Sequence, residues 1–422
     1  MLQDTSLDYT MPKRPHHAPS NPVSGLCSHA RAPLPDELTP LLGNRTPRQF
    51  MRRYWQKKPL LIRQAFPDIA APLARDELFE LADLEDVESR LITHFRKTWN
   101  LEHGPFAPDE LPSVRKREWT LLVQGVNLHD DRAHALMNPF RFIPDARLDD
   151  LMISYATDGG GVGPHFDSYD VFLLQVHGKR RWRIGAQRDL SLKPGLPLKV
   201  LQHFEPEQEW VLEPGDMLYL PPHIAHDGIA EGECMTASIG FRAPSAHELT
   251  AQFLYHLAER TGDAPDSARA NARYRDPGQE PVANPAALPA LLIERVGAIL
   301  ANVDWSEKDI VEFLGTYLSE PKANVVFDSP ERALNEQKFV ERAKKTGIEL
   351  DRKTILLYDA RSFFVNGEAA ALSSKLKKWL PELADTRRLE AKRFVTLTDE
   401  SSMTGLLHEW YRAGWIRMGA LP

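Results

Sequence analysis

The stretch "GGGVGPHFDSYDVFLLQ", residues 159–175, decides the fold. Three glycines precede His165 and Asp167, and an apolar run follows them. On a strand, residues i and i+2 point to the same face, so the imidazole and the carboxylate converge from one side. The glycines let the preceding loop approach a metal without side-chain obstruction, or adopt positive φ. A second histidine from a neighbouring strand would complete the facial triad that binds non-haem Fe(II) and leaves three coordination positions open.

The surrounding sequence predicts a β-rich body followed by helices. Gly or Pro turns separate short β-rich runs, a pattern typical of an antiparallel sandwich or barrel. These runs are residues 119–128, 150–156, "DVFLLQVHG", "RRWRIGA", "EWVLEPGDMLYLPP" and "CMTASIGF", and they stop near Phe241. After Pro244 come three amphipathic helices, "SAHELTAQFLYHLAERTG", "ALLIERVGAILANV" and "EKDIVEFLGTYL". From Lys322, short helices mix with the strand-like runs "TILLYD", "SFFVNG" and "RFVTLT", which predicts a small α+β domain.

This pattern divides the chain into four parts. Residues 1–33 are rich in Pro, Ser and His without periodicity, and we expect a disordered extension. Residues 34–243 form the predicted β-rich catalytic domain, 244–321 a helical region and 322–422 the small C-terminal domain.

A second motif, "EPGDMLYLPPHIAHDG" at residues 213–228, matches the first in spacing. Five residues separate Gly159 from His165, and five separate Gly215 from Pro221. With these spacings the two stretches resemble the paired motifs of the cupin barrel, and in that pattern His226 is the third ligand. The preceding histidine, at 223, stands where cupins prefer glycine. We interpret the histidines at 177, 203 and 223 as ordinary surface or loop residues.

Composition narrows the classes of protein that remain. The chain has 422 residues, a formal charge of −7 and no apolar run long enough to cross a membrane. Its two cysteines, Cys27 and Cys234, exclude a disulfide framework and predict a reducing cytoplasm. The acidic balance argues against a nucleic-acid coat. Residues 331–422 carry 17 Lys and Arg against 13 Asp and Glu, so the excess acid lies in residues 1–330, which suits a basic partner.

An Fe(II) oxygenase usually needs an organic electron donor, and 2-oxoglutarate needs a cation at its far carboxylate. Arginine supplies a bidentate fork for this purpose. The run "HGKRRWRI" offers Lys179, Arg180, Arg181 and Arg183. Alternation sends one parity inward: Arg181 and Arg183 share a face, while Lys179 or Arg180 occupies the turn edge. The residues alone leave the anchor open among these four.

The motifs "GGGVGPHFDSYDVFLLQ", "GKRRWRIG", "PGDMLYLPPHIAHDG" and the early "YWQKKPLLIRQAF" (54–66) resemble the bacterial ribosomal oxygenases of the JmjC class. The likeness covers roughly residues 35–422. It implies a double-stranded β-helix (JmjC/cupin), a helical dimerisation region and a winged-helix-like C-terminal domain. The implied activity is Fe(II)- and 2-oxoglutarate-dependent hydroxylation, with O2 as cosubstrate, of an arginine in large-subunit ribosomal protein sixteen. A homodimer is also implied.

The resemblance also assigns residues. It implies that His165, Asp167 and His226 hold the iron, that Arg180 clamps 2-oxoglutarate, and that Ser154 on the adjacent strand is a further contact. A guanidinium substrate would favour an acid near the mouth, and Asp158, just before the glycines, is the candidate. A turn-forming Asp beside Gly is the alternative reading of Asp158.

Other functions fit parts of the pattern. A halogenase of the same fold needs an open position where Asp167 stands. A JmjC lysine demethylase would share the metal set and act on another basic protein, and eukaryotic relatives hydroxylate histidine. A non-enzymatic DNA-binding regulator would use the cupin as a sensor, with "KLKKWL" the only dense basic run of its C-terminal domain. Salt-dependent binding to duplex DNA would favour the regulator, and succinate production stimulated by a ribosomal protein would favour the hydroxylase.

Overall fold

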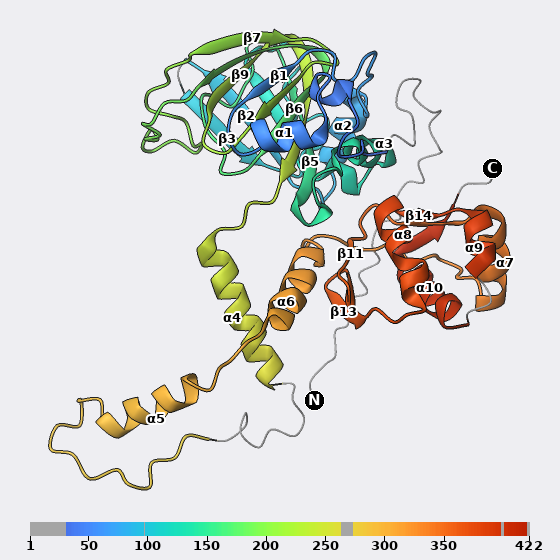
Figure 1. The fold of residues 1–422 in the computed structure, drawn as a ribbon. Helices are drawn as coiled ribbons and strands as arrows, with labels where there is room; N and C mark the ends of the chain where they lie inside the picture. Colours follow the sequence, from blue (N-terminus) through green and yellow to red (C-terminus); the bar gives the residue numbers. More distant parts are fainter. Residues whose placement is uncertain (1–30, 97, 263–272, 398–400, 420–422) are drawn as a thin grey trace, which may run out of the picture.

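The structure, a computed structural model, describes residues 31–96, 98–262, 273–397 and 401–419. The predicted N-terminal extension, residues 1–33, therefore lies almost wholly outside the described residues. A β-rich body, a helical arm and a smaller C-terminal domain follow one another along the chain (Figure 1).

One antiparallel sheet forms the body, with strand order β1-β8-β6-β9-β5-β4-β2-β3 and β7 paired with β6. The strands are β1 (Leu60–Ile62), β2 (Ser89–Phe95), β3 (Thr98–His103), β4 (Trp119–Val123), β5 (Leu148–Ala156), β6 (Val171–Gly185), β7 (Gln208–Leu212), β8 (Met217–Leu220) and β9 (Ala225–Phe241). The predicted strands are present, except that the run 119–128 is a strand only to Val123 and continues as a 3-10 helix over Val126–Leu128. The sequence did not predict the β2–β3 hairpin.

Short helices cover one face of this sheet: α1 (Pro47–Arg53), α2 (Arg75–Ala82) and α3 (Asp131–Met137). Phe50 of α1, Leu78 of α2 and Leu136 of α3 belong to the large apolar core. Phe172 and Leu174 of β6 supply the sheet side of that core. A smaller cluster on the opposite face holds Val171, Leu173, Trp182, Ile184, Leu212, Leu218 and Leu220. The sheet is therefore buried on both faces here, which explains its continuous apolar runs.

β6 differs from the sequence expectation. The runs "DVFLLQVHG" and "RRWRIGA", predicted as two strands, form one strand whose pairing with β9 shifts register between Gln175 and Lys179. Gly178 has φ +61, and a Cβ there would meet the Glu233 oxygen at 2.0 Å, so this irregularity requires glycine. A glycine-centred bulge replaces the predicted turn.

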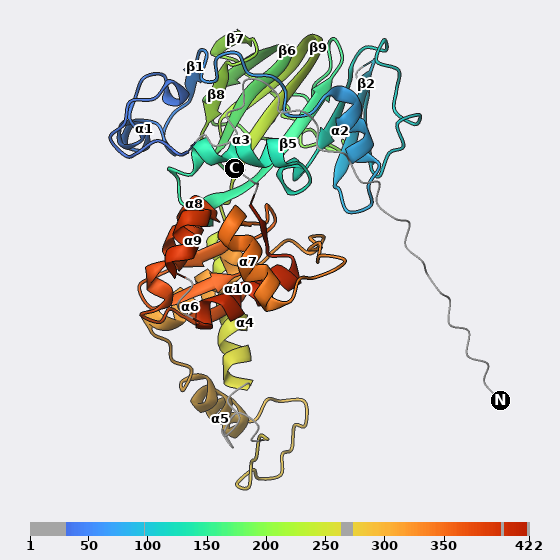
Figure 2. The same ribbon diagram turned by 90° about the vertical axis from the view of Figure 1, so that its right-hand side faces the viewer.

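Three helices follow β9: α4 (Ala246–Gly262), α5 (Ala290–Leu300) and α6 (Glu307–Ser319). All three match helices predicted from the sequence. α4 and α6 lie side by side below the body, whereas α5 extends away from it (Figures 1 and 2). α5 buries none of its residues.

The C-terminal domain combines helices with two three-stranded sheets, β14-β10-β15 and β11-β12-β13. Its helices are α7 (Glu336–Thr346), α8 (Leu380–Thr386), α9 (Ala391–Leu397) and α10 (Ser401–Ala413). Its strands are β10 (Ile348–Leu350), β11 (Leu356–Tyr358), β12 (Ser362–Val365), β13 (Glu368–Ala371), β14 (Arg388–Leu389) and β15 (Ile416–Met418). The strand-like reading of "RFVTLT" was wrong, because its described residues, 393–397, belong to α9. Phe394 and Leu397, three residues apart, enter the core on one helical face.

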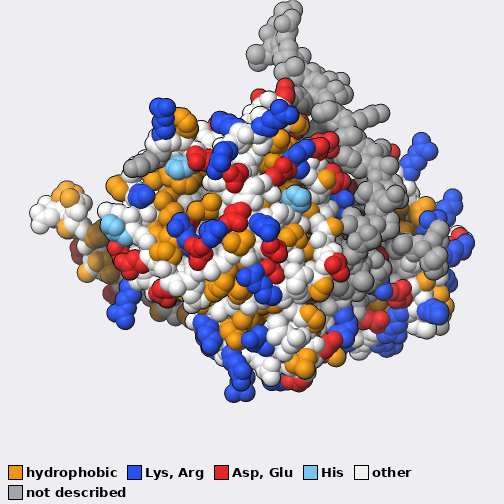
Figure 3. Space-filling view, turned by 90° about the horizontal axis from the view of Figure 1, so that it is seen from above, with side chains coloured by type: hydrophobic (Ala, Val, Ile, Leu, Met, Phe, Trp, Pro, Cys, Tyr) orange, Lys and Arg blue, Asp and Glu red, His pale blue; other side chains and the backbone are white. Residues whose placement is uncertain are grey.

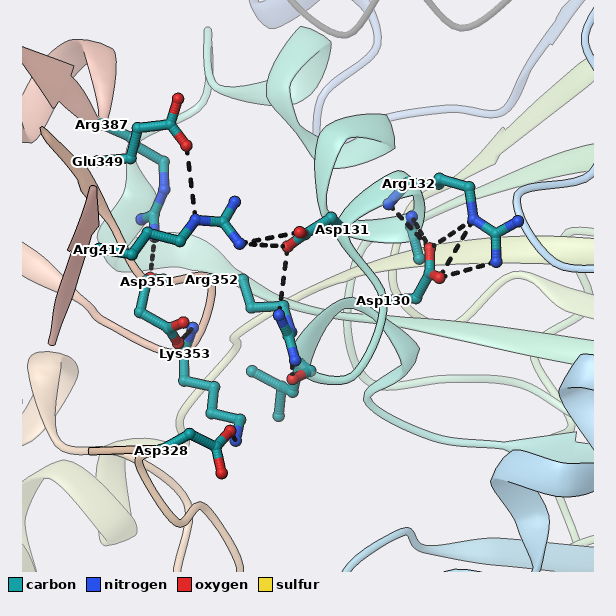
Figure 4. Close-up of polar contacts among 12 residues, drawn as sticks. Asp130, Asp131, Arg132, Asp328, Glu349, Asp351, Arg352, Lys353, Arg387 and Arg417 are labelled. Atoms are coloured by element: carbon teal, nitrogen blue, oxygen red, sulfur yellow. Dashed lines mark hydrogen bonds and ion pairs between the residues drawn. The ribbon is translucent and has the colours of Figure 1, made fainter. Parts of the chain in front are cut away.

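The C-terminal domain docks on the body through polar contacts. Asp131, at the first turn of α3, pairs with Arg352 at 3.2 Å and with Arg417 at 2.8 Å. Arg141 of the body donates to the main-chain oxygens of Ala384 and Asp385. Figure 4 shows Arg352 and Arg417 converging on Asp131. Charged side chains therefore hold the two domains together.

Within the described parts of the chain, no helix has both the length and the apolar character needed to cross a membrane. Seen from above, basic and acidic side chains intermingle over the molecule (Figure 3). The predicted boundaries at 243/244 and 321/322 stay predictions. β9 ends at Phe241 and α4 begins at Ala246, while α6 ends at Ser319.

Candidate metal centre and cosubstrate pocket

The structure brings His165, Asp167 and His226 together. Each offers one ligand atom, and these atoms lie within 4.8 Å of one another. His226 Nε2 is 3.6 Å from Asp167 Oδ2, and the two imidazole centroids are 4.2 Å apart. His226 is the second residue of β9. The sequence suggested a strand for His165 and Asp167, but both lie in the loop before β6. A single antiparallel bridge between His165 and His226 positions them instead.

Both imidazoles have their Nε2 free for a metal. His165 Nδ1 is 2.9 Å from the Gly163 carbonyl oxygen, and His226 Nδ1 is 2.9 Å from the Ile224 carbonyl oxygen. A carbonyl oxygen only accepts, so each Nδ1 carries a proton, and the neutral form of each ring then has its lone pair on Nε2. Burial and then the neighbouring His165 lower the pKa of His226 to about 4, so it is neutral near pH 7. Neutral imidazole is the form that binds metals.

The glycine loop lies closely against β9. A Cβ on Gly161 would meet the Gly228 carbonyl oxygen at 2.5 Å, so a side chain there would push the loop away from the strand. Gly163 has φ +79, the left-handed region that favours glycine. These two positions explain why glycines precede His165.

The turn before His226 supports the carboxylate ligand. The His223 main-chain N–H donates to the Asp167 carbonyl oxygen at 2.8 Å. His223 has φ +65, the conformation that glycine adopts most easily, so the turn keeps its shape with a less favourable residue. The side chain of His223 is exposed, as are those of the histidines at 177 and 203.

Arg180 lies buried inside the barrel and is 5% exposed. Its Nη1 donates to Ser154 Oγ at 3.1 Å, whereas its buried Nε and Nη2 have no partner among the described residues. A buried guanidinium with orphaned donors and no carboxylate partner is costly unless an anion joins it. The Arg180–Ser154 pair therefore forms a place for a carboxylate.

The other three basic residues of this strand point outward. Lys179 pairs with Glu213, Arg181 with Glu209 and Glu231, and Arg183 with Asp227. The predicted shared face of Arg181 and Arg183 is correct, but it is the outer face. The bulge at Gly178 shifts the parity, so Arg180 faces inward with Trp182.

Trp182 is the site residue that the sequence did not identify. Its ring lies 5.9 Å from the Arg180 Cζ and 5.9 Å from the His226 ring centroid. A Cβ on Gly228 would meet the ring at 2.7 Å, so glycine there makes room for it. Trp182 therefore lies beside both the arginine and one metal ligand and gives the pocket an apolar side. The sequence could have identified Trp182 from its position two residues after Arg180, because residues i and i+2 of a strand share a face.

Asp158 lies in the turn after β5 and contacts β9 away from His226. Its Oδ1 accepts from the Gly232 N–H at 2.9 Å, and its Oδ2 pairs with Arg117 at 2.8 Å. Gly232 is six residues beyond His226 in the same strand. Asp158 thus holds a turn together, as the structural reading expected, and it also binds one guanidinium. A role for Asp158 in binding substrate stays a prediction.

The chain is similar to known proteins over most of its length. The chain matches the JmjC domain family over residues 135–249 and the ROXA-like winged helix over residues 300–417. It is 33% identical over 371 residues to the ribosomal protein uL16 3-hydroxylase of Escherichia coli, covering 87% of this chain and 96% of that protein. It is 40% identical to a probable ribosomal oxygenase of Haemophilus influenzae, covering 51% of this chain and 52% of that protein.

A solved structure agrees along most of the chain. The ribosomal oxygenase of Escherichia coli in complex with cobalt and 2-oxoglutarate matches with a TM-score of 0.73 and 32% identity. The match covers 88% of this chain and 98% of that one. The predicted fold class, a JmjC barrel followed by helices and a winged-helix domain, is confirmed. The chain belongs to the JmjC-type ribosomal oxygenases.

Proposed function

We propose that this protein is an Fe(II)- and 2-oxoglutarate-dependent oxygenase that hydroxylates ribosomal protein uL16 on an arginine side chain. The main observation behind this proposal is that His165, Asp167 and His226 form a cluster of metal ligands. The same barrel buries the Arg180 guanidinium, two of whose nitrogens have no hydrogen-bond partner among the described residues. A relative 33% identical to this chain is named uL16 3-hydroxylase, which supports the choice of substrate protein. The halogenase alternative is disfavoured, because Asp167 occupies the position that a halide would need.

The donor set fits Fe(II). Two neutral imidazoles and one carboxylate on one side of an ion form the facial triad of non-haem iron oxygenases. His165, Asp167 and His226 would hold the metal. When bound, Fe(II) with 2-oxoglutarate and O2 supplies the oxidising chemistry.

The pocket around Arg180 fits 2-oxoglutarate. We infer that the unpartnered Nε and Nη2 donate to its far carboxylate, while Ser154 Oγ supplies another polar contact. Charge-assisted, forked hydrogen bonds of this kind are strong and directional. The solved complex of the similar Escherichia coli ribosomal oxygenase with cobalt and 2-oxoglutarate supports this assignment.

The chain's own residues position and protect the reactants. The Gly163 and Ile224 carbonyl oxygens fix the orientation of the two imidazoles through their Nδ1 protons. Trp182, which lies beside Arg180 and His226, would give the bound cosubstrate an apolar wall and exclude water from that side. Gly161 lets the loop that carries His165 lie close against β9. These features would orient the cosubstrate beside the metal ligands.

We propose Asp158 as the residue that would bind the guanidinium of a substrate arginine. Asp158 pairs with the Arg117 guanidinium. A substrate arginine would take the place of Arg117 and form the same kind of contact with Asp158. A reducing cytoplasmic location follows if the substrate is a ribosomal protein. Buried Cys234 is a free thiol, which is consistent with that location.

We also propose a homodimer formed through the helical arm. Apolar residues of α5 are exposed, among them Ile293 at 59%, Ile299 at 57% and Leu300 at 64%. Trp305, between α5 and α6, is 57% exposed. A cluster of exposed apolar residues on a soluble protein marks an interaction surface. A second copy would cover this face.

The experiment incubates the purified protein with Fe(II), 2-oxoglutarate and recombinant uL16, and weighs uL16 by intact-mass analysis. We expect one added oxygen atom, located on an arginine by fragmentation, and no addition with the Asp167→Ala variant. An oxygen on histidine would replace the arginine assignment. Unmodified uL16 after incubation with metal-loaded wild type would refute the substrate proposal.

A further inference from the structure

A second cavity lies between the body and the C-terminal domain. Its volume is about 90 Å³, well above the roughly 10–15 Å³ that one water needs. The body contributes α3 and the start of β5, and the C-terminal domain contributes residues 352–356 and Arg387. None of the proposed metal or cosubstrate residues lines it. Figure 2 shows α3 and β5 facing α8 across this interface.

Basic side chains outnumber acidic ones around the cavity. The acids are Asp145, Asp149 and Asp150. The cations are Arg141, Arg242, Lys322, Arg352, Lys353 and Arg387. Lys353, for example, pairs with Asp328 at 2.9 Å, and Arg141 pairs with Asp145 at 2.5 Å. The lining therefore keeps a net positive charge after its own acids are counted.

Of the cations that line the cavity, Arg387 is the one that has no carboxylate within ion-pair distance among the described residues. Its Nη2 donates only to the main-chain oxygens of Asp351, at 2.8 Å, and Thr354, at 3.0 Å. Burial and then the charge of Arg141 lower the pKa of Arg387 to about 10. Its φ is +60 at the end of α8, where glycine is the usual residue. An arginine held in that conformation indicates that its side chain is needed there.

The buried imidazole of His134, in α3, is a second observation that points to a ligand in this cavity. It lines the same cavity, and its buried Nδ1 has no hydrogen-bond partner within the described ranges. Burial, followed by the charges of Arg387 and Arg417, lowers the pKa of His134 well below its ordinary value. A neutral imidazole can still present an N–H donor from Nδ1. A buried donor without an acceptor is commonly explained by an ion or water bound beside it.

We propose that this cavity binds a small oxyanion, with inorganic phosphate as the representative ligand. Arg387 offers a guanidinium fork from the C-terminal domain, and His134 offers a neutral N–H from the body. The anion would link the two domains through one ligand. The cavity volume admits a single small oxyanion and excludes a nucleotide.

The test is isothermal titration of the full-length protein with phosphate in chloride buffer at constant ionic strength. We expect one phosphate per chain, at least about tenfold weaker binding by Arg387→Gly, and weaker binding by His134→Ala. Glycine suits φ +60, so Arg387→Gly removes the guanidinium without straining the backbone. Arg387→Gln is a second neutral variant that keeps the length of the side chain, and circular dichroism checks the fold of each.

Two controls locate the binding. Arg132 pairs with Asp130 and Glu77 and does not line the cavity, so Arg132→Ala should bind phosphate within about twofold of wild type. Arg180→Ala should also keep the affinity, because its guanidinium belongs to the other pocket. Adenosine monophosphate should not compete. The proposal is overturned by absent binding to wild type, by equal binding to the Arg387 variants, by loss of binding in Arg180→Ala, or by equally tight nucleotide binding.

Discussion

His165 and His226 exchange both of their main-chain hydrogen bonds. The His165 N–H donates to the His226 oxygen at 2.9 Å, and the His226 N–H donates back to the His165 oxygen at 2.8 Å. The loop before β6 and the start of β9 are thereby joined through backbone atoms. The two imidazoles are positioned by a contact that does not depend on their side chains.

Replacing a proposed metal ligand should therefore abolish turnover while leaving the fold intact. For His165→Ala and Asp167→Ala we expect no succinate above background and a melting temperature close to wild type without metal. Affinity for Mn(II) should fall by more than the roughly 10–100-fold caused by losing a residue that only orients a ligand. Succinate release and calorimetry measure the two effects. Normal succinate yield from metal-loaded Asp167→Ala would contradict the assignment.

Arg180→Ala should raise the concentration of 2-oxoglutarate needed for half-maximal turnover. Loss of hydrogen bonds to a charged group costs about 1.5–3 kcal/mol, which corresponds to about 10–150-fold. The matched control is Lys179→Ala, whose side chain is exposed and pairs with Glu213. An unchanged 2-oxoglutarate requirement in Arg180→Ala, with a raised one in Lys179→Ala, would move the anchor to Lys179. Without cosubstrate, Arg180→Met should melt no lower than wild type, because the orphaned donors are gone.

Gly161→Ala should weaken metal binding without touching a ligand. The new Cβ would lie 2.5 Å from the Gly228 oxygen, so the loop carrying His165 must move away from β9. We expect lower Mn(II) affinity together with a destabilisation of about 1–3 kcal/mol, measured by titration and urea unfolding. Gly405→Ala in α10 is the control, since its Cβ meets nothing within 4 Å. Equal metal affinity in the two variants would show that the close approach of the loop is dispensable.

His134 should make the protein less stable in mild acid. Its pKa in the folded state is lowered well below 6.5 by burial and nearby arginines, so between the two values the unfolded chain binds more protons. Stability is then highest above the ordinary pKa and falls as the pH drops below it, by at most about 1.4 kcal/mol per pH unit. Urea unfolding in phosphate-free buffer from pH 7 to 5 measures this loss. His134→Gln should show a flatter profile, and parallel profiles would exclude a contribution from His134.

Ile299→Asp on α5 should convert a dimer to a monomer. A charge in the centre of an apolar interface is left desolvated and unpaired. Light scattering after size exclusion measures the mass of each variant at several concentrations. Leu38→Asp, at a position 66% exposed on the body, should remain dimeric. A monomeric wild type at micromolar concentration would contradict the proposed interface.

The sequence could predict the candidate ligands because two motifs with matched spacing carry them. Helices α4 to α6 were also predictable, since their apolar residues recur at helical spacing. Tertiary context decided the rest. The run "RFVTLT" favours a strand by composition, yet Phe394 and Leu397 bury one face as part of a helix. The cavity partners His134 and Arg387 are 253 residues apart in sequence, so no local pattern could join them.

The bulge at Gly178 has a consequence for how this strand tolerates change. Val171 and Leu173, before the bulge, belong to the same cluster as Trp182 and Ile184, after it. The residues on this face of the strand are therefore odd-numbered before the bulge and even-numbered after it. Deleting one residue between Gln175 and Lys179 would restore strict alternation and still leave Arg180 inside the barrel, because Arg180 would then follow Leu173 by an even number of positions. Straightening the bulge without a deletion would instead rotate Arg180 out to water and bring its neighbour into the barrel. Relatives that differ in length at this point should therefore be aligned by the face of the strand on which the arginine lies, because a one-residue change in length keeps the arginine inside only where the bulge changes with it.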